Sequence, residues 1–295
     1  MKVEKQQDSS ELTYKRRGQG AEVWRRFKKS KTAVIGLIML SVLIFLAIFA
    51  DVITPYDAEI SDAANRLQLP SAEHIFGTDE LGRDIFARIA AGTRISLMVG
   101  LVSVTISAFG GIVLGAIAGY YGGKVDTIIM RFIDIWMAIP SLLLNITIVA
   151  VLGVGLENVM IAIGISNIPG YCRTIRASIM SIKSSEFIEA AKACGSSDFR
   201  LIVSHIIPNS LAPLIVQATL RMGASILVCA SMSFMGLGVV PPTPEWGAML
   251  STGRSFLRDY PHLCTFPGAA IMYTVLSMNL LGDGIRDALD PKLKN

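Results

Sequence analysis

Six long apolar runs constrain this chain more than any other feature of its sequence. They cover residues 32–50, 95–120, 132–152, 159–179, 210–237 and 263–282. A run of about twenty apolar residues is what an α-helix needs to cross the hydrocarbon of a bilayer. Hydrophobic residues make up 52% of the chain and charged residues only 17%, which argues against an ordinary soluble domain. We therefore predict an all-α integral membrane protein with six transmembrane helices.

Basic residues predict how these spans are oriented, because positively charged loops stay in the cytoplasm. Residues 1–31 hold ten Lys or Arg, whereas residues 51–93 hold three against eight acidic side chains. Six spans then return the carboxyl terminus to the cytoplasmic side, together with residues 172–208 and their five basic side chains. The net charge of +4 is thus an orientation signal. No basic run outside the amino terminus is dense enough to indicate a nucleic-acid partner.

The two ends of the chain lie outside the spans. We expect residues 1–31 to form a basic cytoplasmic tail, disordered to about residue 20, and residues 285–295 a second tail, with the transmembrane domain at 32–284. Val23, Trp24 and Phe27 share one face of residues 21–29, as in a helix at the membrane interface; a plain basic flank is the alternative. The first apolar run begins too late, and is too long, for a cleaved signal peptide.

One polar segment, at about residues 184–208, interrupts the apolar runs and still has the pattern of a helix. Its apolar positions recur at spacings of three and four beside Glu186 and Glu189; they are Phe187, Ala190, Ala191 and Cys194. Gly195 is expected to end this helix. Pro208 is expected to stop the helix before it and to start the next span. A short amphipathic helix held out from the membrane favours docking to another protein, although a loop without a partner remains the alternative.

The fifth run has small and weakly polar side chains, which favours an interface or a passage over a lipid-facing span. Arg221 lies in its middle third, with Ser225 and Ser233 further along. An unpaired charge at the bilayer centre costs about 2.5–3.5 kcal/mol on insertion scales, so Arg221 should face water or a partner. We predict that these three residues line a pathway. Asp134 and Glu157 are candidate ion-pair partners of Arg221, and a purely structural ion pair is the alternative.

Two further patterns concern how the helices pack. Gly111, Gly115 and Gly119 are spaced by four, and small residues at that spacing let helix backbones approach closely in lipid. Static packing is one interpretation, and sliding against a partner subunit is the other. At the start of the third run, Arg131 and Asp134 are expected to form an interfacial charge pair that orients this helix.

Nothing in the sequence indicates catalysis by this chain. Gly122-Gly123-Lys124 is the nearest approach to a phosphate-binding loop, but Val125 follows where Ser or Thr must hold magnesium. The four cysteines and three histidines are scattered, so we expect no disulfide framework and no metal site. A site shared by His74 and His262, both in predicted outer loops, is the one alternative. We expect no enzyme activity and no cofactor.

Several motifs resemble one family of transporters. Glu189-Ala190-Ala191, followed by Gly195 and then by Pro208, resembles the EAA loop of ABC importer permeases. The segment 76–84, FGTDELGRD, resembles a signature of the second, C-type permease subunit of dipeptide, oligopeptide and nickel importers; Asp79 is expected to cap the helix that follows. Segments 233–247 and 279–291 extend the resemblance over nearly the whole chain.

The resemblance implies a type I ABC importer permease in a bacterial or archaeal cytoplasmic membrane. Its partners would be a homologous second permease, two ABC ATPases that bind ATP and magnesium, and an extracytoplasmic substrate-binding protein. The EAA helix would be the ATPase-coupling element, with Glu186, Glu189, Ala190, Ala191, Gly195, Asp198 and Pro208. Di- and oligopeptides are the expected cargo. Nickel chelates or glutathione are alternatives, and a secondary transporter is the competing class.

Overall fold

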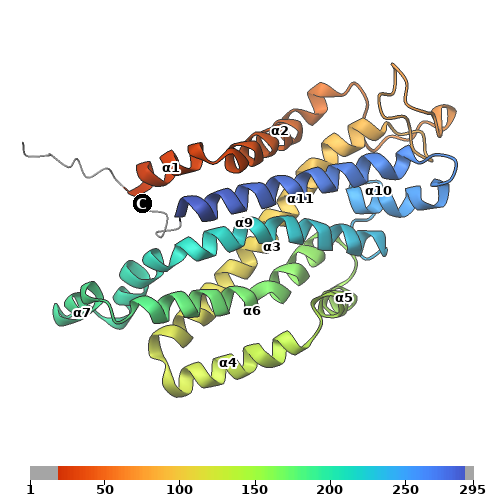
Figure 1. Ribbon diagram of the computed structural model, residues 1–295. Coiled ribbons are helices and arrows are strands. Elements are labelled where there is room, and N and C mark those ends of the chain that lie inside the picture. The colour runs from red at the N-terminus through yellow and green to blue at the C-terminus, as the bar shows by residue number, and fades with distance from the viewer. Residues whose placement is uncertain (1–18, 290–295) are drawn as a thin grey trace, which may run out of the picture.

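The computed structural model describes residues 19–289, and helices dominate this part of the chain (Figure 1). The helices are α1 (Gln19–Lys29), α2 (Lys31–Ile53), α3 (Ile85–Tyr121), α4 (Gly123–Ala138), α5 (Ser141–Leu152), α6 (Leu156–Ile182), α7 (Glu186–Ala193), α8 (Asp198–Arg200), α9 (Ile207–Phe234), α10 (Trp246–Gly253) and α11 (His262–Leu289). Among these residues, β structure is limited to a bridge between Thr78 and Asp84. The all-α prediction is therefore confirmed.

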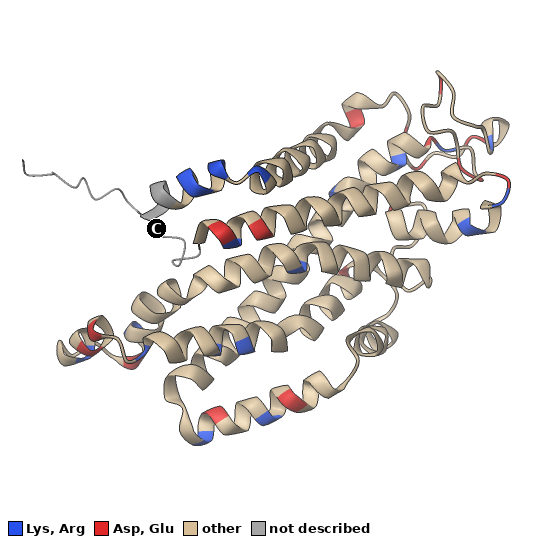
Figure 2. Ribbon diagram, viewed as in Figure 1, with Lys and Arg blue, Asp and Glu red and all other residues tan. Residues whose placement is uncertain are grey.

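The long helices run side by side, and the short ones lie at the two ends of the bundle. In Figure 1, α7 projects at one end, and α10 lies at the other end with the loop between α2 and α3. We call this second group, residues 54–84 and α10, the cap. Figure 2 shows that charged residues gather mainly at these two ends, with a further set along α4 and α6. This distribution is that of a bundle whose middle lies in lipid.

Length and composition support four to five of the six predicted spans. The four are α2, α3, the continuous helix Asp198–Phe234 and α11, and the bent pair α4–α5 is a fifth if it counts as one span. The fourth predicted span, 159–179, lies within α6, which has 27 residues. Asn167, Arg173 and Arg176 make α6 more polar than the other long helices. The count of six therefore stays a prediction.

The third predicted span, 132–152, differs from a single straight helix. Its two parts, α4 and α5, meet at an angle of 88°. Ile139 has an extended backbone (φ −83°, ψ 124°), because Pro140 disfavours the helical conformation of the residue before it. The break leaves α4 on one edge of the bundle, as Figure 1 shows.

The glycine stripe of α3 packs against α6 of the same chain. A Cβ atom added at Gly111 would lie 2.3 Å from Cβ of Tyr171, and one added at Gly115 would lie 2.0 Å from Cγ2 of Ile175. Both distances are too short for any side chain, so the two backbones approach as closely as glycine allows. The stripe is a packing surface within the chain, and the interpretation that it slides against a partner subunit is wrong.

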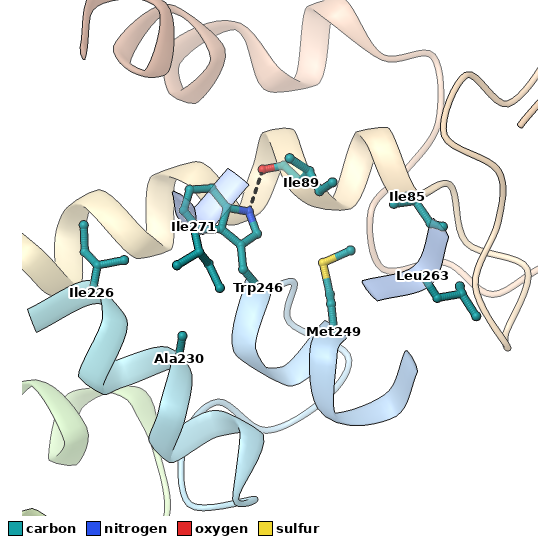
Figure 3. Packing of buried hydrophobic residues seen from close by; sticks show 8 residues of the cluster. All are labelled: Ile85, Ile89, Ile226, Ala230, Trp246, Met249, Leu263 and Ile271. Carbon is teal, nitrogen blue, oxygen red and sulfur yellow. Dashed lines mark hydrogen bonds between the residues drawn. The ribbon is translucent and has the colours of Figure 1, made fainter. Parts of the chain in front are cut away.

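A cluster of buried apolar residues joins the cap to the bundle (Figure 3). Trp246 is its largest member, and the indole Nε1–H donates a hydrogen bond of 3.2 Å to the carbonyl oxygen of Ile89. Glu245 begins α10 by accepting bonds from the backbone N–H groups of Gly247 and Ala248. Through Trp246, the short helix α10 is held against the outer part of α3.

The loop before α3 is organised by two buried carboxylates. Asp84 caps α3, because Oδ1 accepts from the N–H of Ala87 at 2.7 Å. Asp79 instead accepts from the N–H groups of Leu81 and Arg83, and forms an ion pair with the Arg83 guanidinium at 2.7 Å. The prediction that Asp79 caps the helix is therefore wrong; Asp79 closes the turn before it. Sequence spacing alone could not show which of two Asp residues five positions apart caps α3.

Residues 21–29 are helical and lie within α1; the place of this helix at the membrane interface stays a prediction. Phe27 is buried and contributes to a cluster with Ala33 of α2 and Leu281 and Ala288 of α11, whereas Trp24 is half exposed. Residues 1–18 of the predicted amino-terminal tail and residues 290–295 of the predicted carboxyl-terminal tail lie outside the described residues.

Candidate functional site

The helix α7 lies in the predicted polar segment and ends as predicted. Gly195 has a φ of +80°, a conformation that costs other residues free energy. The N–H of Gly195 donates to the carbonyl of Lys192, and the N–H of Ser196 donates to that of Ala191, at 3.0 and 3.2 Å. This pair of bonds is a Schellman motif, which turns the chain sharply after α7.

The apolar residues of α7 face in two directions. Ile188 is buried, 4% exposed, and packs in a cluster with Ile179 and Ile206 that ties α7 to the bundle. Phe187 is 47% exposed, and Ala190 and Cys194 are exposed beside it. The predicted stripe is thus an outward-facing surface, while the residue that anchors the helix, Ile188, was not in it. We call Phe187, Ala190 and Cys194 the α7 face.

A cavity of about 460 Å³ lies between α7 and the end of α3. Glu189 and Lys192 of α7 line it, with Tyr120, Lys183 and Asp198. The Tyr120 hydroxyl donates a hydrogen bond of 2.5 Å to Oδ1 of Asp198, and the Lys183 ammonium lies 3.4 Å from the carbonyl oxygen of Gly119. The segment that carries α7 is therefore tied to α3 by polar contacts as well as by apolar packing.

Pro208 does not stop the helix before it. The helix runs continuously from Asp198 to Phe234, and Leu201–Ile206 form a π-helical turn just before α9. The N–H of Ile207 donates to the carbonyl of Ile202, five residues back. A π-helical turn is wider than an α-helical one, and we attribute to this the room for the proline ring. The prediction is correct only in that α9 begins next to Pro208.

The three residues predicted to line a pathway on α9 lie in different environments. Arg221 is exposed and has no hydrogen bond or ion pair with any residue between 19 and 289. Ser225 and Ser233 are buried within the chain, and the Ser233 hydroxyl accepts from the N–H of Val239. Of the three, Arg221 alone faces outward, and the lining role of the two serines stays a prediction.

Neither of the predicted partners of Arg221, Asp134 and Glu157, forms an ion pair with it in the described part of the chain. Asp134 of α4 accepts a hydrogen bond of 2.6 Å from Nη2 of Arg173 on α6, so the predicted pair of Asp134 with Arg131 is also wrong. A second ion pair joins the same helices, because Arg176 donates two hydrogen bonds to Asp126, at 2.5 and 2.6 Å. Sequence spacing missed both pairs since they join residues about forty to fifty positions apart.

A polar pocket of about 270 Å³ lies where α4 and α5 meet at their break. Arg221 of α9 lines it together with Ser166, Asn167 and Gly170 of α6 and Trp136 of α4. We call this the Arg221 pocket. Asn167 was not singled out in the sequence, because a single amide within an apolar run gives no pattern.

The histidines and cysteines do not converge. Nδ1 of His74 lies 2.9 Å from Oδ2 of Asp84, and His262 packs beside Gly77. Between residues 19 and 289 there is no group of three His, Cys, Asp or Glu side chains placed to hold a metal ion. The cysteines in this part of the chain are free thiols.

Comparison with known families identifies the family of this chain. Residues 111–295 match the family described as binding-protein-dependent transport system inner membrane component, and the chain belongs to this family of ABC importer permeases. Residues 18–70 match the N-terminal transmembrane domain of oligopeptide transport permease C, which identifies the branch.

Relatives match along nearly the whole chain. The dipeptide transport system permease protein DppC of Alkalihalophilus pseudofirmus is 51% identical over 274 residues, which cover 93% of this chain and 90% of the relative. The glutathione transport system permease protein GsiD of Pectobacterium atrosepticum is 46% identical over 275 residues, covering 93% and 91%. The GsiD protein of Escherichia coli is 48% identical over 274 residues, covering 92% and 90%.

Solved structures show the same fold at low sequence identity. The MetNI methionine ABC transporter, in an inward-facing conformation, matches with a TM-score of 0.56 and 16% identity, covering 69% of this chain and 97% of that chain. An amino acid ABC transporter matches with a TM-score of 0.52 and 16% identity, covering 68% and 92%. The fold is that of an ABC importer permease.

Proposed function

We propose that this chain is one of two permease subunits of an ATP-driven importer of dipeptides. It would lie in a bacterial or archaeal cytoplasmic membrane with six spans and with both termini inside. Two further observations support this proposal: the basic residues at the amino terminus, and the family match to an inner membrane component. In this orientation α7 lies on the cytoplasmic side and the cap on the opposite side.

The α7 face carries the proposal that a separate ATPase drives transport. Phe187, Ala190 and Cys194 expose apolar surface at the end of the molecule, and exposed apolar patches of this kind mark protein contacts. Ile188 and the Tyr120–Asp198 hydrogen bond connect that surface to α6, α9 and α3. Two ABC ATPases would bind ATP and magnesium, and this chain would supply no cofactor site of its own.

The ATPase subunits would drive this chain through contacts that differ between its two conformations. Nucleotide binding moves the ATPase subunits, and a ligand shifts a conformational equilibrium only if it contacts the two states differently. Four of the coupling residues lie on α7: Glu186, Glu189, Ala190 and Ala191. Gly195 and Asp198 follow α7, and Pro208 lies at the start of α9. Together these residues would transmit that difference to the helices. A homologous second permease would complete the pathway, and an extracytoplasmic binding protein would deliver cargo to the cap.

Dipeptides are the favoured cargo because the DppC relative is 51% identical to this chain. Glutathione is the second candidate, since the GsiD relatives are 46 to 48% identical. Both are small peptides that carry a free carboxylate, so the permease would meet the same charged group in either cargo. Selection between them would rest largely with the separate binding protein.

Reconstitution of the full importer tests the proposal. We expect ATP-dependent dipeptide uptake into proteoliposomes that contain both permeases, both ATPases and the binding protein. Gly195→Pro should abolish uptake while membrane insertion remains intact, because proline holds φ near −65° and cannot donate the bond to Lys192. Gly195→Asn is the matched control, since asparagine tolerates the left-handed conformation, and it should retain uptake.

Two results would count against the proposal. Full transport by Gly195→Pro would contradict the proposal that α7 couples the ATPases to transport. Uptake by this chain alone, without ATPase subunits, would instead indicate a secondary transporter. Uptake of glutathione and not of dipeptides would keep the mechanism and change the cargo.

A further inference from the structure

Arg221 is a charged residue placed where a charge is costly, and the residues that the structure describes do not neutralise it. It lies near the middle of the 28-residue helix α9, which belongs to a candidate membrane span. Charges at that depth are rare and mark substrate or ion pathways when they face a cavity. Arg221 has no ion pair with any residue between 19 and 289, since Asp134 is occupied by Arg173.

The surroundings of Arg221 suit an anion of small size. The Arg221 pocket has a volume of about 270 Å³ and is lined by neutral polar groups, Ser141, Ser166 and Asn167, and by apolar groups such as Trp136. No acidic side chain lines it, so the guanidinium is the only charge there among the described residues. A planar guanidinium binds a carboxylate through two parallel hydrogen bonds.

The neighbouring turn of α9 places an amide beside the guanidinium. Gln217 lies four residues before Arg221, and a Cβ atom added at Gly170 would lie 3.4 Å from Gln217 Nε2 and 3.9 Å from Arg221 Nη2. Both side chains therefore reach the same point on α6. The Oε1 atom of Gln217 is buried and has no hydrogen-bond donor among the described residues. Gln217 does not itself line the Arg221 pocket, so the contact with a carboxylate in the pocket falls to Arg221.

We propose that Arg221, with Gln217 beside it, binds the carboxylate of the cargo as it passes the break between α4 and α5. This inference rests on the proposed function, and it adds a carboxylate subsite within the permease itself. It also accounts for the lack of acidic side chains in the lining of the pocket, because an acid there would neutralise the guanidinium before cargo arrived.

The test compares a dipeptide that has a free carboxylate with the same dipeptide as its C-terminal amide. Uptake of both is measured in proteoliposomes that contain the complete importer, with the binding protein saturated by each cargo in turn. We expect Arg221→Gln to reduce uptake of the free dipeptide roughly 10- to 100-fold. This factor corresponds to the free energy that a hydrogen bond between charged groups usually contributes. The slower uptake of the amide should be unchanged by the substitution, and Arg221→Lys should recover part of the loss.

Arg173→Gln is the matched control. It also removes an arginine from this region, but one that pairs with Asp134 at 2.6 Å and does not line the pocket. We expect it to change the uptake of both cargoes by the same factor. Receptor-stimulated ATP hydrolysis, measured in parallel, reports whether each variant is assembled and coupled.

Other results would overturn the inference in distinguishable ways. An equal loss for free dipeptide and amide in Arg221→Gln would mean that Arg221 pairs with an acid of the second permease. Unchanged uptake of both cargoes would mean that the pocket is not on the pathway. If the wild-type importer carries neither cargo, the proposed function fails and this inference fails with it.

Discussion

At the scale of single residues, Asp79 in the cap is a buried charge that depends on its ion-pair partners. Its carboxylate is buried and faces two buried guanidinium groups, Arg83 at 2.7 Å and Arg88 at 3.5 Å. Arg88 in turn donates to the carbonyl oxygen of Ala58, at 2.7 Å. Asp79 therefore holds together the turn before α3, the first residues of α3 and the loop after α2.

We expect Asp79→Ala to destabilise the protein by about 3–5 kcal/mol, because it leaves buried charge without compensation. The measurement is thermal unfolding of the purified permease complex in detergent. Glu80→Ala is the control: Glu80 lies next to Asp79 in sequence, but its carboxylate is 3.6 Å from Arg83 and nearer the surface. It should cost less than about 1 kcal/mol. Equal losses from the two variants would contradict this account of the cap.

At the scale of elements, α4 is held to α6 in part by its two ion pairs. Much of its apolar surface is exposed, including Ile128, Phe132 and Ile135. The side chains of Asp126 and Arg176 are 18 and 26% exposed, whereas those of Asp134 and Arg173 are 46 and 45% exposed. Less exposed pairs lose less of their attraction to solvent screening.

Double-mutant cycles should rank the two pairs accordingly. We expect a coupling free energy of about 1 kcal/mol for Asp126 with Arg176, and less than about 0.5 kcal/mol for Asp134 with Arg173. Unfolding of single and double alanine variants in detergent gives both values. A larger coupling for the more exposed pair would show that solvent exposure does not decide the strength of these two ion pairs.

Sequence patterns predicted the elements better than the contacts between them. Helix α7 and its end at Gly195 follow from local spacing and from glycine's freedom at positive φ, which are properties of a few neighbouring residues. The bend at Ile139 was not predicted, although Pro140 was visible, because a proline within an apolar run does not always break the helix. Pro169, Pro213 and Pro267 lie inside continuous helices. The ion-pair partners of Asp134 and Asp126 depend on which helices become neighbours, and nothing in the local sequence records that.

At the scale of the whole molecule, the native cysteines report the topology. Cys194 is exposed on the α7 face, while Cys172 and Cys229 are buried and Cys264 is partly buried. We expect a membrane-impermeant maleimide to label Cys194 in inside-out vesicles, and bound ATPase subunits to slow that labelling. Cys194→Ser should remove the signal. Labelling of Cys194 from outside intact cells would contradict the orientation and the docking role together.

The length of α3 has one more consequence. Its 37 residues extend over roughly 55 Å at the rise of an α-helix, from Asp84 in the cap to Tyr120 beside the segment that carries α7. Gly111, Gly115 and Gly119 press one half of this helix against α6. Two backbones in such close contact move as one unit. A push on the segment that carries α7 would therefore reach the cap along a single stiff rod.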